Sequence, residues 1–135
     1  MPAQWPRLET VKQEENRLEA MTVCVVDDSR DAADSLALLL HTLGHRAFAC
    51  YSASQALASI EAQRPDCVML DIAMQGIDGL ELTRQLRCKF GDDIVLVAIT
   101  GAAMDDPRVK ATFETVDHYF EKPVTLQQIQ KLFPK

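Results

Sequence analysis

The sequence lacks a long apolar run and an excess of positive charge, and both absences exclude classes of function. Its longest uninterrupted apolar run, Ile94 to Ile99, is too short to span a bilayer. Residues 1–20 are polar and lack the apolar region of a secretory signal. The 135 residues include 14 Lys and Arg against 20 Asp and Glu, a net charge of −6, so the clustered positive charge that phosphate backbones require is missing. We therefore expect a cytoplasmic protein that binds neither nucleic acid nor membrane directly.

Paired cysteines are also absent. The cysteines lie far apart in the sequence and form no C-x-x-C motif, so neither a disulfide framework nor a zinc site is expected. The three histidines likewise have no spacing typical of a metal site or a catalytic triad. We expect the histidines to be structural and all four cysteines to be small buried side chains, these being Cys24, Cys50, Cys67 and Cys88.

From Thr22 onward, short apolar runs alternate with segments of helical spacing. The first 20 residues, rich in charge, are expected to form a flexible arm or linker, followed by one domain over residues 21–135. Five strand–helix units predict an α/β fold with a parallel sheet covered by helices on both faces. The predicted strands are 22–26, 45–50, 67–70, 94–99 and 118–121, and the predicted helices are a first one ending before Gly44 and then 52–63, 80–89, 108–114 and 126–133.

Polar side chains follow four of these five strands. Asp27 and Asp28 come after the first strand, Asp71 after the third, Thr100 after the fourth and Lys122 after the fifth. The carboxyl ends of parallel strands meet at one edge of a sheet, which is where ligand sites of such folds lie. We therefore expect these five side chains to form one site.

The residue types at this edge favour phosphoryl chemistry. Three carboxylates repel one another unless a cation lies among them, and oxygen ligands without histidine or cysteine favour Mg²⁺ or Mn²⁺. A lysine and a threonine hydroxyl can neutralise phosphoryl oxygens, and an Asp carboxylate can act as a nucleophile. The set fits an Asp that accepts a phosphoryl group.

The motifs around these residues resemble those of the receiver domain of two-component response regulators. The resemblance covers about residues 21–133 and implies a flavodoxin-like, doubly wound (βα)5 fold with strand order 2-1-3-4-5. The five motifs, in the order and spacing of the family, are Val25-Val26-Asp27-Asp28-Ser29, Met69-Leu70-Asp71-Ile72, Gly76-Ile77-Asp78-Gly79, Ala98-Ile99-Thr100-Gly101 and Glu121-Lys122-Pro123.

The resemblance implies a role for each residue of the metal and phosphoryl site. Asp71 would be the phosphoacceptor. Asp28, with Asp27 partly through water, would hold Mg²⁺ together with Asp71 and the backbone carbonyl of Ala73. Lys122 would bridge the phosphoryl group and an acidic side chain.

A second set of implied roles concerns the switch. Thr100 would turn its hydroxyl toward the phosphoryl group, and Tyr119 matches the aromatic residue that turns inward when the threonine moves. The Lys122–Pro123 peptide bond would be cis. Two positions depart from the family: Gln75 stands where a proline is usual, and Thr115 stands where a glycine usually closes the fourth helix.

The resemblance also implies partners. A histidine kinase or a histidine phosphotransfer protein would donate the phosphoryl group, and an unknown protein would respond downstream. The domain would assist its own phosphorylation and slow autodephosphorylation without being a turnover enzyme, as a monomer or weak dimer. Residues 28–35 resemble receivers attached to hybrid histidine kinases, so the chain is expected to be a stand-alone regulator or a module of such a kinase.

The same residues allow other interpretations. Asp28 could cap the first helix, Asp71 and Thr100 could be turn residues, and Lys122 could be a surface charge. A phosphorylation-independent interaction module would keep the fold without the chemistry. A flavin carrier would need a phosphate-binding loop after the first strand, where two carboxylates stand instead. A haloacid-dehalogenase-like phosphatase would need a D-x-D pair, which the segment from Asp71 to Ala73 does not provide.

Overall fold

The protein is described by a computed structural model over residues 21–72, 79–101, 111 and 114–132. The predicted arm over residues 1–20 and most of the helix predicted at 108–114 lie outside these residues. The remaining predicted elements are all present within them.

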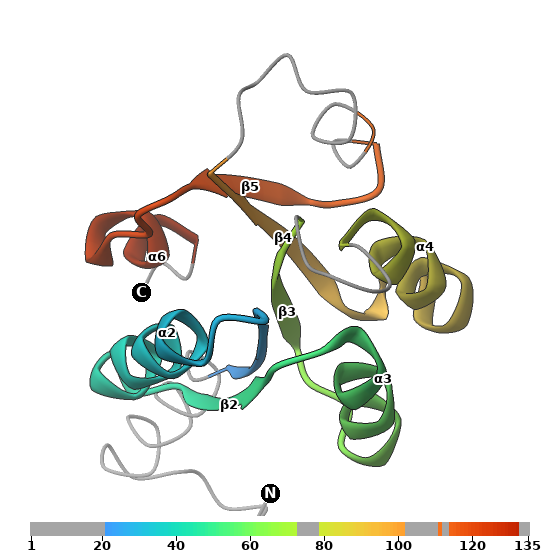
Figure 1. Cartoon of the computed structure of the whole chain (residues 1–135), viewed down its shortest axis with the longest axis horizontal. Coiled ribbons are helices and arrows are strands. Elements are labelled where there is room, and N and C mark those ends of the chain that lie inside the picture. Colours follow the sequence, from blue (N-terminus) through green and yellow to red (C-terminus); the bar gives the residue numbers. More distant parts are fainter. Residues whose placement is uncertain (1–20, 73–78, 102–110, 112–113, 133–135) are drawn as a thin grey trace, which may run out of the picture.

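Five parallel strands form one sheet with the order β2-β1-β3-β4-β5 (Figure 1). The predicted fold class and strand order are therefore confirmed. Two strands extend one residue further at their carboxyl ends than predicted, because the sheet ladder continues through the polar residue there and pairs Asp71 with Ile99 and Thr100 with Glu121. β2 and β4 each begin one residue later than predicted. The strands are β1 (Thr22–Val26), β2 (Arg46–Cys50), β3 (Cys67–Asp71), β4 (Val95–Thr100) and β5 (His118–Glu121).

Helices cover both faces of the sheet, as predicted. In Figure 1, α2 and α6 lie against one face and α3 and α4 against the other. The described helices are α2 (Arg30–Thr42), α3 (Ala53–Ala62), α4 (Gly79–Phe90) and α6 (Leu126–Leu132), with a short 3-10 turn η1 (Gly91–Asp93) after α4.

Local sequence signals set the ends of α2. Its first turn is capped by Ser29, whose hydroxyl accepts a hydrogen bond from the Ala32 N–H at 3.4 Å. The interpretation of Asp28 as the cap is therefore wrong. The helix ends at Thr42, and Gly44, just beyond its C-cap Leu43, takes a left-handed φ of 94° that other residues rarely adopt.

Successive side chains along a strand point to opposite faces of the sheet, which divides the core into two layers. In β1, Cys24 and Val26 face α3 and α4, whereas Val23 and Val25 face α2 and α6. Leu40 and Ile129 fill the second layer, and they are fully buried. Both faces of the sheet are thus covered, which explains why the strands read as continuous apolar runs.

The cysteine prediction is confirmed for three positions and wrong for one. Cys24, Cys50 and Cys67 are buried in strands, but Cys88 is exposed on α4. Leu82 and Leu86 supply the apolar face of that helix, so the position of Cys88 between its charged neighbours falls on the solvent side.

No helix among the described residues has both the length and the apolar character needed to cross a membrane.

Candidate functional site

The carboxyl edge of the sheet brings together residues that are far apart in the sequence. Asp71 is the last residue of β3, Asp27 follows β1, and Lys122 follows β5. The Lys122 ammonium donates hydrogen bonds to Asp71 Oδ2 at 3.1 Å and to Asp27 Oδ2 at 3.2 Å. One cation therefore lies between two carboxylates whose residues are 6% and 7% exposed.

The backbone fixes both carboxylates in place. The Asp27 N–H donates to the Cys50 carbonyl at 3.0 Å, which continues the β1–β2 ladder by one residue, and Asp27 Oδ1 accepts from the Ser29 N–H at 3.0 Å. After Asp71, the Ile72 N–H donates to the Ile99 carbonyl at 3.1 Å. Neither carboxylate lies on a free loop, so their separation is set by the sheet.

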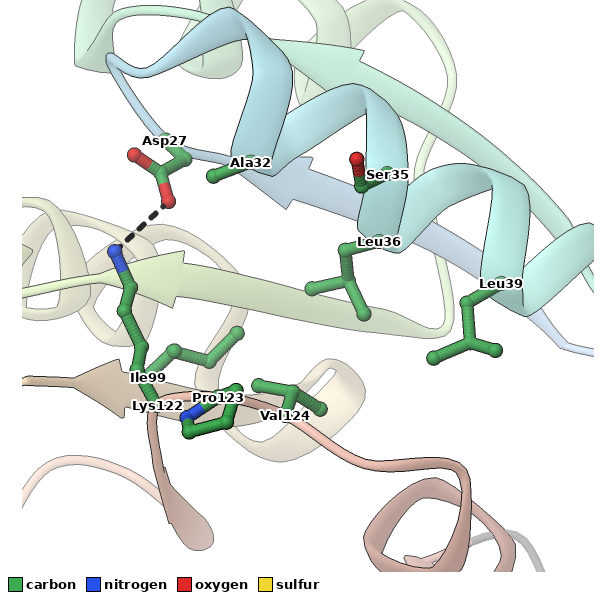
Figure 2. Close-up of a pocket in the computed structure, with 9 residues that line it drawn as sticks. All are labelled: Asp27, Ala32, Ser35, Leu36, Leu39, Ile99, Lys122, Pro123 and Val124. Carbon is green, nitrogen blue, oxygen red and sulfur yellow. Dashed lines mark hydrogen bonds and ion pairs between the residues drawn. The ribbon is translucent and has the colours of Figure 1, made fainter.

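Burial and neighbouring charges shift the pKa values of Asp27 and Lys122, whose ion pair is drawn in Figure 2. Burial raises the pKa of Asp27 and the charge of Asp71 raises it further, whereas the Ser29 N–H and Lys122 act in the opposite direction. Burial by itself would lower the pKa of Lys122, but its hydrogen bonds to Asp71 and Asp27 and their charges raise the pKa overall. The lysine therefore stays protonated and partly offsets the negative charge.

A divalent cation fits the acidic cluster. Asp27, Asp28 and Asp71 each bring a carboxylate oxygen within 4.8 Å of the others, and Asp28 is exposed while the other two are buried. Three negative charges against one ammonium leave an excess of negative charge at the mouth of the site. Oxygen-only donors of this kind suit Mg²⁺ or Mn²⁺.

Thr100 and Tyr119 flank the cluster on the neighbouring strands. Thr100 ends β4 and is 1% exposed, and its carbonyl accepts from the Lys122 N–H at 2.8 Å. Tyr119 on β5 is half-buried and packs against Ile72 and Ala98. The Lys122–Pro123 peptide bond is cis.

Several residues singled out in the sequence lie outside the described residues, namely Ala73, Gln75 and the first three residues of the third motif, Gly76, Ile77 and Asp78. Thr115 is described, and it does not adopt a positive φ. Its hydroxyl lies 3.0 Å from that of Thr83, and its carbonyl accepts from Arg87 Nε at 2.8 Å. Side-chain bonds from α4 thus fix this position in the absence of a glycine.

Sequence reasoning missed the role of Gly79, the first residue of α4. A Cβ there would lie 2.4 Å from the Ile72 Cα and 2.7 Å from the Asp71 carbonyl oxygen. The missing side chain allows the helix to begin against the backbone that presents Asp71. The available signal was the glycine that ends the third motif and opens the helix that follows.

Arg87 was also missed, because its partners are distant in the sequence. Besides Thr115, its guanidinium donates to the carbonyls of Gly91 and Ile94 and to Asp117 Oδ2, the last at 2.6 Å. Asp117 in turn accepts from the Leu96 N–H at 2.8 Å. These bonds tie α4 to the residues just before β4 and to the residues just before β5.

Comparison with known proteins gives a consistent result. Residues 23–133 match the family model described as the response regulator receiver domain. The response regulator MprA of Mycobacterium avium is 35% identical over 109 residues, which cover 81% of this chain and 47% of that protein. The response regulator MprA of Mycolicibacterium vanbaalenii is 36% identical over 107 residues, with 79% and 46% covered. The chain spans about half the length of the curated relatives it matches.

Solved structures agree with the sequence comparison. A response regulator receiver domain (CheY-like) from Methylobacillus flagellatus has a TM-score of 0.76 at 28% identity, covering 84% of this chain and 95% of that one. NtrX from Brucella abortus, in complex with ATP, has a TM-score of 0.76 at 30% identity, covering 84% of this chain and 26% of that one.

Proposed function

The chain belongs to the response regulator receiver domain family, and on that premise we propose that Asp71 accepts a phosphoryl group from a phosphohistidine in a two-component phosphorelay. The observation that carries this proposal is the contact of one ammonium, that of Lys122, with two buried carboxylates at the carboxyl edge of the sheet. A phosphoryl group on Asp71 would lie close enough to the Lys122 ammonium to accept a hydrogen bond from it.

In the proposed step, a carboxylate oxygen of Asp71 attacks phosphorus and forms an O–P bond. The N–P bond to the donor imidazole breaks, and its electron pair stays on the imidazole nitrogen, which takes up a proton. Lys122 offsets charge on the phosphoryl oxygens, and the Thr100 hydroxyl at the end of β4 donates to one of them. Asp27 holds the ammonium in place by its 3.2 Å contact.

Mg²⁺, or Mn²⁺ in its place, would be held by Asp27, Asp28 and Asp71 together with the Ala73 carbonyl. When bound, the ion supplies the positive charge that the three carboxylates and the phosphoryl group together lack. The protein holds two of these carboxylates, those of Asp27 and Asp71, at the carboxyl ends of the neighbouring strands β1 and β3, so that few side chains need to be ordered when the ion binds.

Phosphorylation would act as a switch through Thr100 and Tyr119. New charge at Asp71 draws the threonine hydroxyl inward, and the half-buried ring of Tyr119 on the next strand follows it. The altered surface would then recruit or release a downstream protein.

The donor would be a histidine kinase or a histidine phosphotransfer protein in the cytoplasm. The chain itself would be a stand-alone regulator or part of a hybrid kinase, and it would act without turnover of a substrate.

Intact-protein mass after incubation with acetyl phosphate or phosphoramidate tests the proposal. We expect a gain of one phosphoryl group that depends on Mg²⁺ and is lost when EDTA is present. Asp71→Asn should abolish the gain. Asp92→Asn is the matched control, because this carboxylate is fully exposed on η1, away from the cluster.

Two results would contradict the proposal. One is a folded wild-type protein that gains no mass with either donor, which would favour a phosphorylation-independent interaction module. The other is an equal gain in wild type and Asp71→Asn, which would place the phosphoryl group on another residue.

A further inference from the structure

Thr83 on α4 is a fully buried polar side chain that the proposed site does not use. It lies one turn after Gly79, on the face of α4 that is turned toward the core. The other buried polar side chains of the described residues are three at the carboxyl edge of the sheet and one histidine, namely Asp27, Asp71, Thr100 and His45. A hydroxyl is costly to bury unless it is hydrogen-bonded, so the partners of Thr83 indicate what this position does.

The Thr83 hydroxyl makes one bond within its helix and one to a distant segment. Its Oγ1 donates to the Leu80 carbonyl at 2.7 Å and lies 3.0 Å from Thr115 Oγ1. A hydroxyl carries a single proton, so the proton of the second bond comes from Thr115. One turn further along α4, Arg87 Nε donates to the Thr115 carbonyl at 2.8 Å. The helix thus holds both the side chain and the backbone of a residue that lies just before β5.

The residue after Thr115 shares a packing site with the ring of Tyr119. Val116 and Tyr119 both pack against the same two buried side chains, those of Ile72 and Ala98. Ala98 is also the partner of Tyr119 in the ladder between β4 and β5. Because both side chains lie on one small apolar surface, the position of Val116 limits the space into which the half-buried tyrosine ring can move.

We propose that Thr83 is a positioning residue for the Tyr119 switch. Its bond to Thr115 holds Val116 in place, and this restricts how far the tyrosine ring turns inward before phosphorylation. The inference rests on the switch proposed above and adds to it a residue of α4 that contacts neither the acidic cluster nor Lys122. Without the bond, the inward position of the ring should be more populated in the unphosphorylated protein.

A role in stability alone can be separated from this positioning role. Replacing both members of a hydrogen-bonded pair by apolar groups of the same shape can leave stability nearly unchanged. The double variant Thr83→Val/Thr115→Val therefore removes the bond without leaving a hydroxyl of this pair buried. Thr83→Ser keeps the hydroxyl and should keep the bond.

The ring of Tyr119 can be observed directly, because the chain has only two tyrosines, Tyr51 and Tyr119. The parent protein for the test is the full chain with Tyr51→Phe, labelled with fluorotyrosine, in which fluorine NMR reports position 119 alone. Spectra are recorded with Mg²⁺ before and after incubation with acetyl phosphate. Intact mass of the same samples gives the extent of phosphorylation, and circular dichroism shows that each variant is folded.

In unphosphorylated Thr83→Val we expect the resonance to lie part of the way from the unphosphorylated toward the phosphorylated position of the parent. Loss of one neutral hydrogen bond changes the equilibrium between the two ring positions about fivefold. The double variant should show the same partial shift, and Thr83→Ser should match the parent. Thr42→Val is the matched control, because it removes a threonine hydroxyl that donates only within its own helix, to the Leu38 carbonyl at 3.0 Å.

Parent-like resonances in both Thr83→Val and the double variant, while phosphorylation still shifts the parent, would overturn this inference and leave the proposed switch intact. An equal shift in Thr83→Ser or Thr42→Val would also overturn it. A phosphorylated parent whose resonance does not move would overturn the switch and this inference with it, and absence of any mass gain would overturn the proposed role of Asp71. A partial shift confined to Thr83→Val and the double variant supports the proposal.

Discussion

Replacing Asp71 by Asn should stabilise the protein when Mg²⁺ is absent. The three acidic ligand atoms lie within 4.8 Å of one another. With an effective dielectric constant of about 20, each of the two neighbouring carboxylates then repels Asp71 by at least about 3.5 kcal/mol at this 4.8 Å separation, so that the two together contribute about 7 kcal/mol. The Lys122 ammonium, 3.1 Å away, attracts Asp71 by about 5 kcal/mol on the same basis. Repulsion exceeds attraction by about 2 kcal/mol.

Asparagine keeps the shape of the side chain and an oxygen that accepts from Lys122. We therefore expect the free energy of unfolding of Asp71→Asn in EDTA to exceed that of the wild type by about 2 kcal/mol. Urea unfolding followed by circular dichroism measures this difference. Mg²⁺ should stabilise the wild type more than the variant, because the ion loses one ligand in the variant.

The matched control is Asp92→Asn, which removes an exposed carboxylate outside the cluster. It should change neither the stability in EDTA nor the response to Mg²⁺. A variant Asp71→Asn that is less stable than the wild type in EDTA would refute the reasoning, because it would mean that Lys122 alone outweighs the repulsion among the carboxylates.

Three further predictions concern the residues that support the site. Arg87→Met should lower the free energy of unfolding by about 2 kcal/mol, because it leaves two partly buried carbonyls and the exposed carboxylate of Asp117 without their donor. Urea unfolding would show the loss, and a loss below about 1 kcal/mol would contradict the prediction. Gly79→Ala should cost about 2 kcal/mol, since its Cβ would lie 2.7 Å from the Asp71 carbonyl oxygen. It should also slow acetyl phosphate labelling, whereas Gly44→Ala, with open space around its Cβ, should affect stability alone. Burial would raise the pKa of Asp117, but its hydrogen bonds to the Leu96 N–H and to Arg87 hold this pKa below the ordinary value of 3.8. The contribution of the Asp117 carboxylate to stability is therefore fully present above about pH 4 and is lost as the pH falls further. The free energy of unfolding of Asp117→Asn, measured between about pH 2 and 5, should lack this part of the pH dependence.

Much of this architecture could be predicted from local pattern. Alternation of apolar runs with helical spacing predicts strands and helices because each element must bury one face or both. Polar residues directly after the runs mark the carboxyl edge, which places Asp27, Asp71 and Thr100 together once the sheet is parallel. The proposed site residues among the described part of the chain lie at this edge, although their chemical roles stay predictions.

Contacts between distant segments could not be predicted in this way. Lys122 and Asp27 are 95 residues apart, and only the order of the strands makes one ammonium serve two carboxylates. Cys88 was expected to be buried because of its residue type, but the rotation of α4, set by Leu82 and Leu86, exposes it.

The apolar stripe of α2 shows the same division between sequence and tertiary structure. Its spacing predicts that Leu36, Leu39 and Leu40 point inward, and Leu40 is fully buried in the core. Leu36 is buried in the same core layer and Leu39 packs against it, as predicted, and both also line a cavity between α2 and the segment from Lys122 to Val124 (Figure 2). A sequence determines which side chains avoid water, since this depends on residue type and period. Whether such a side chain packs against another apolar side chain of the protein depends on how the helices pack on the sheet. The tertiary structure alone decides this.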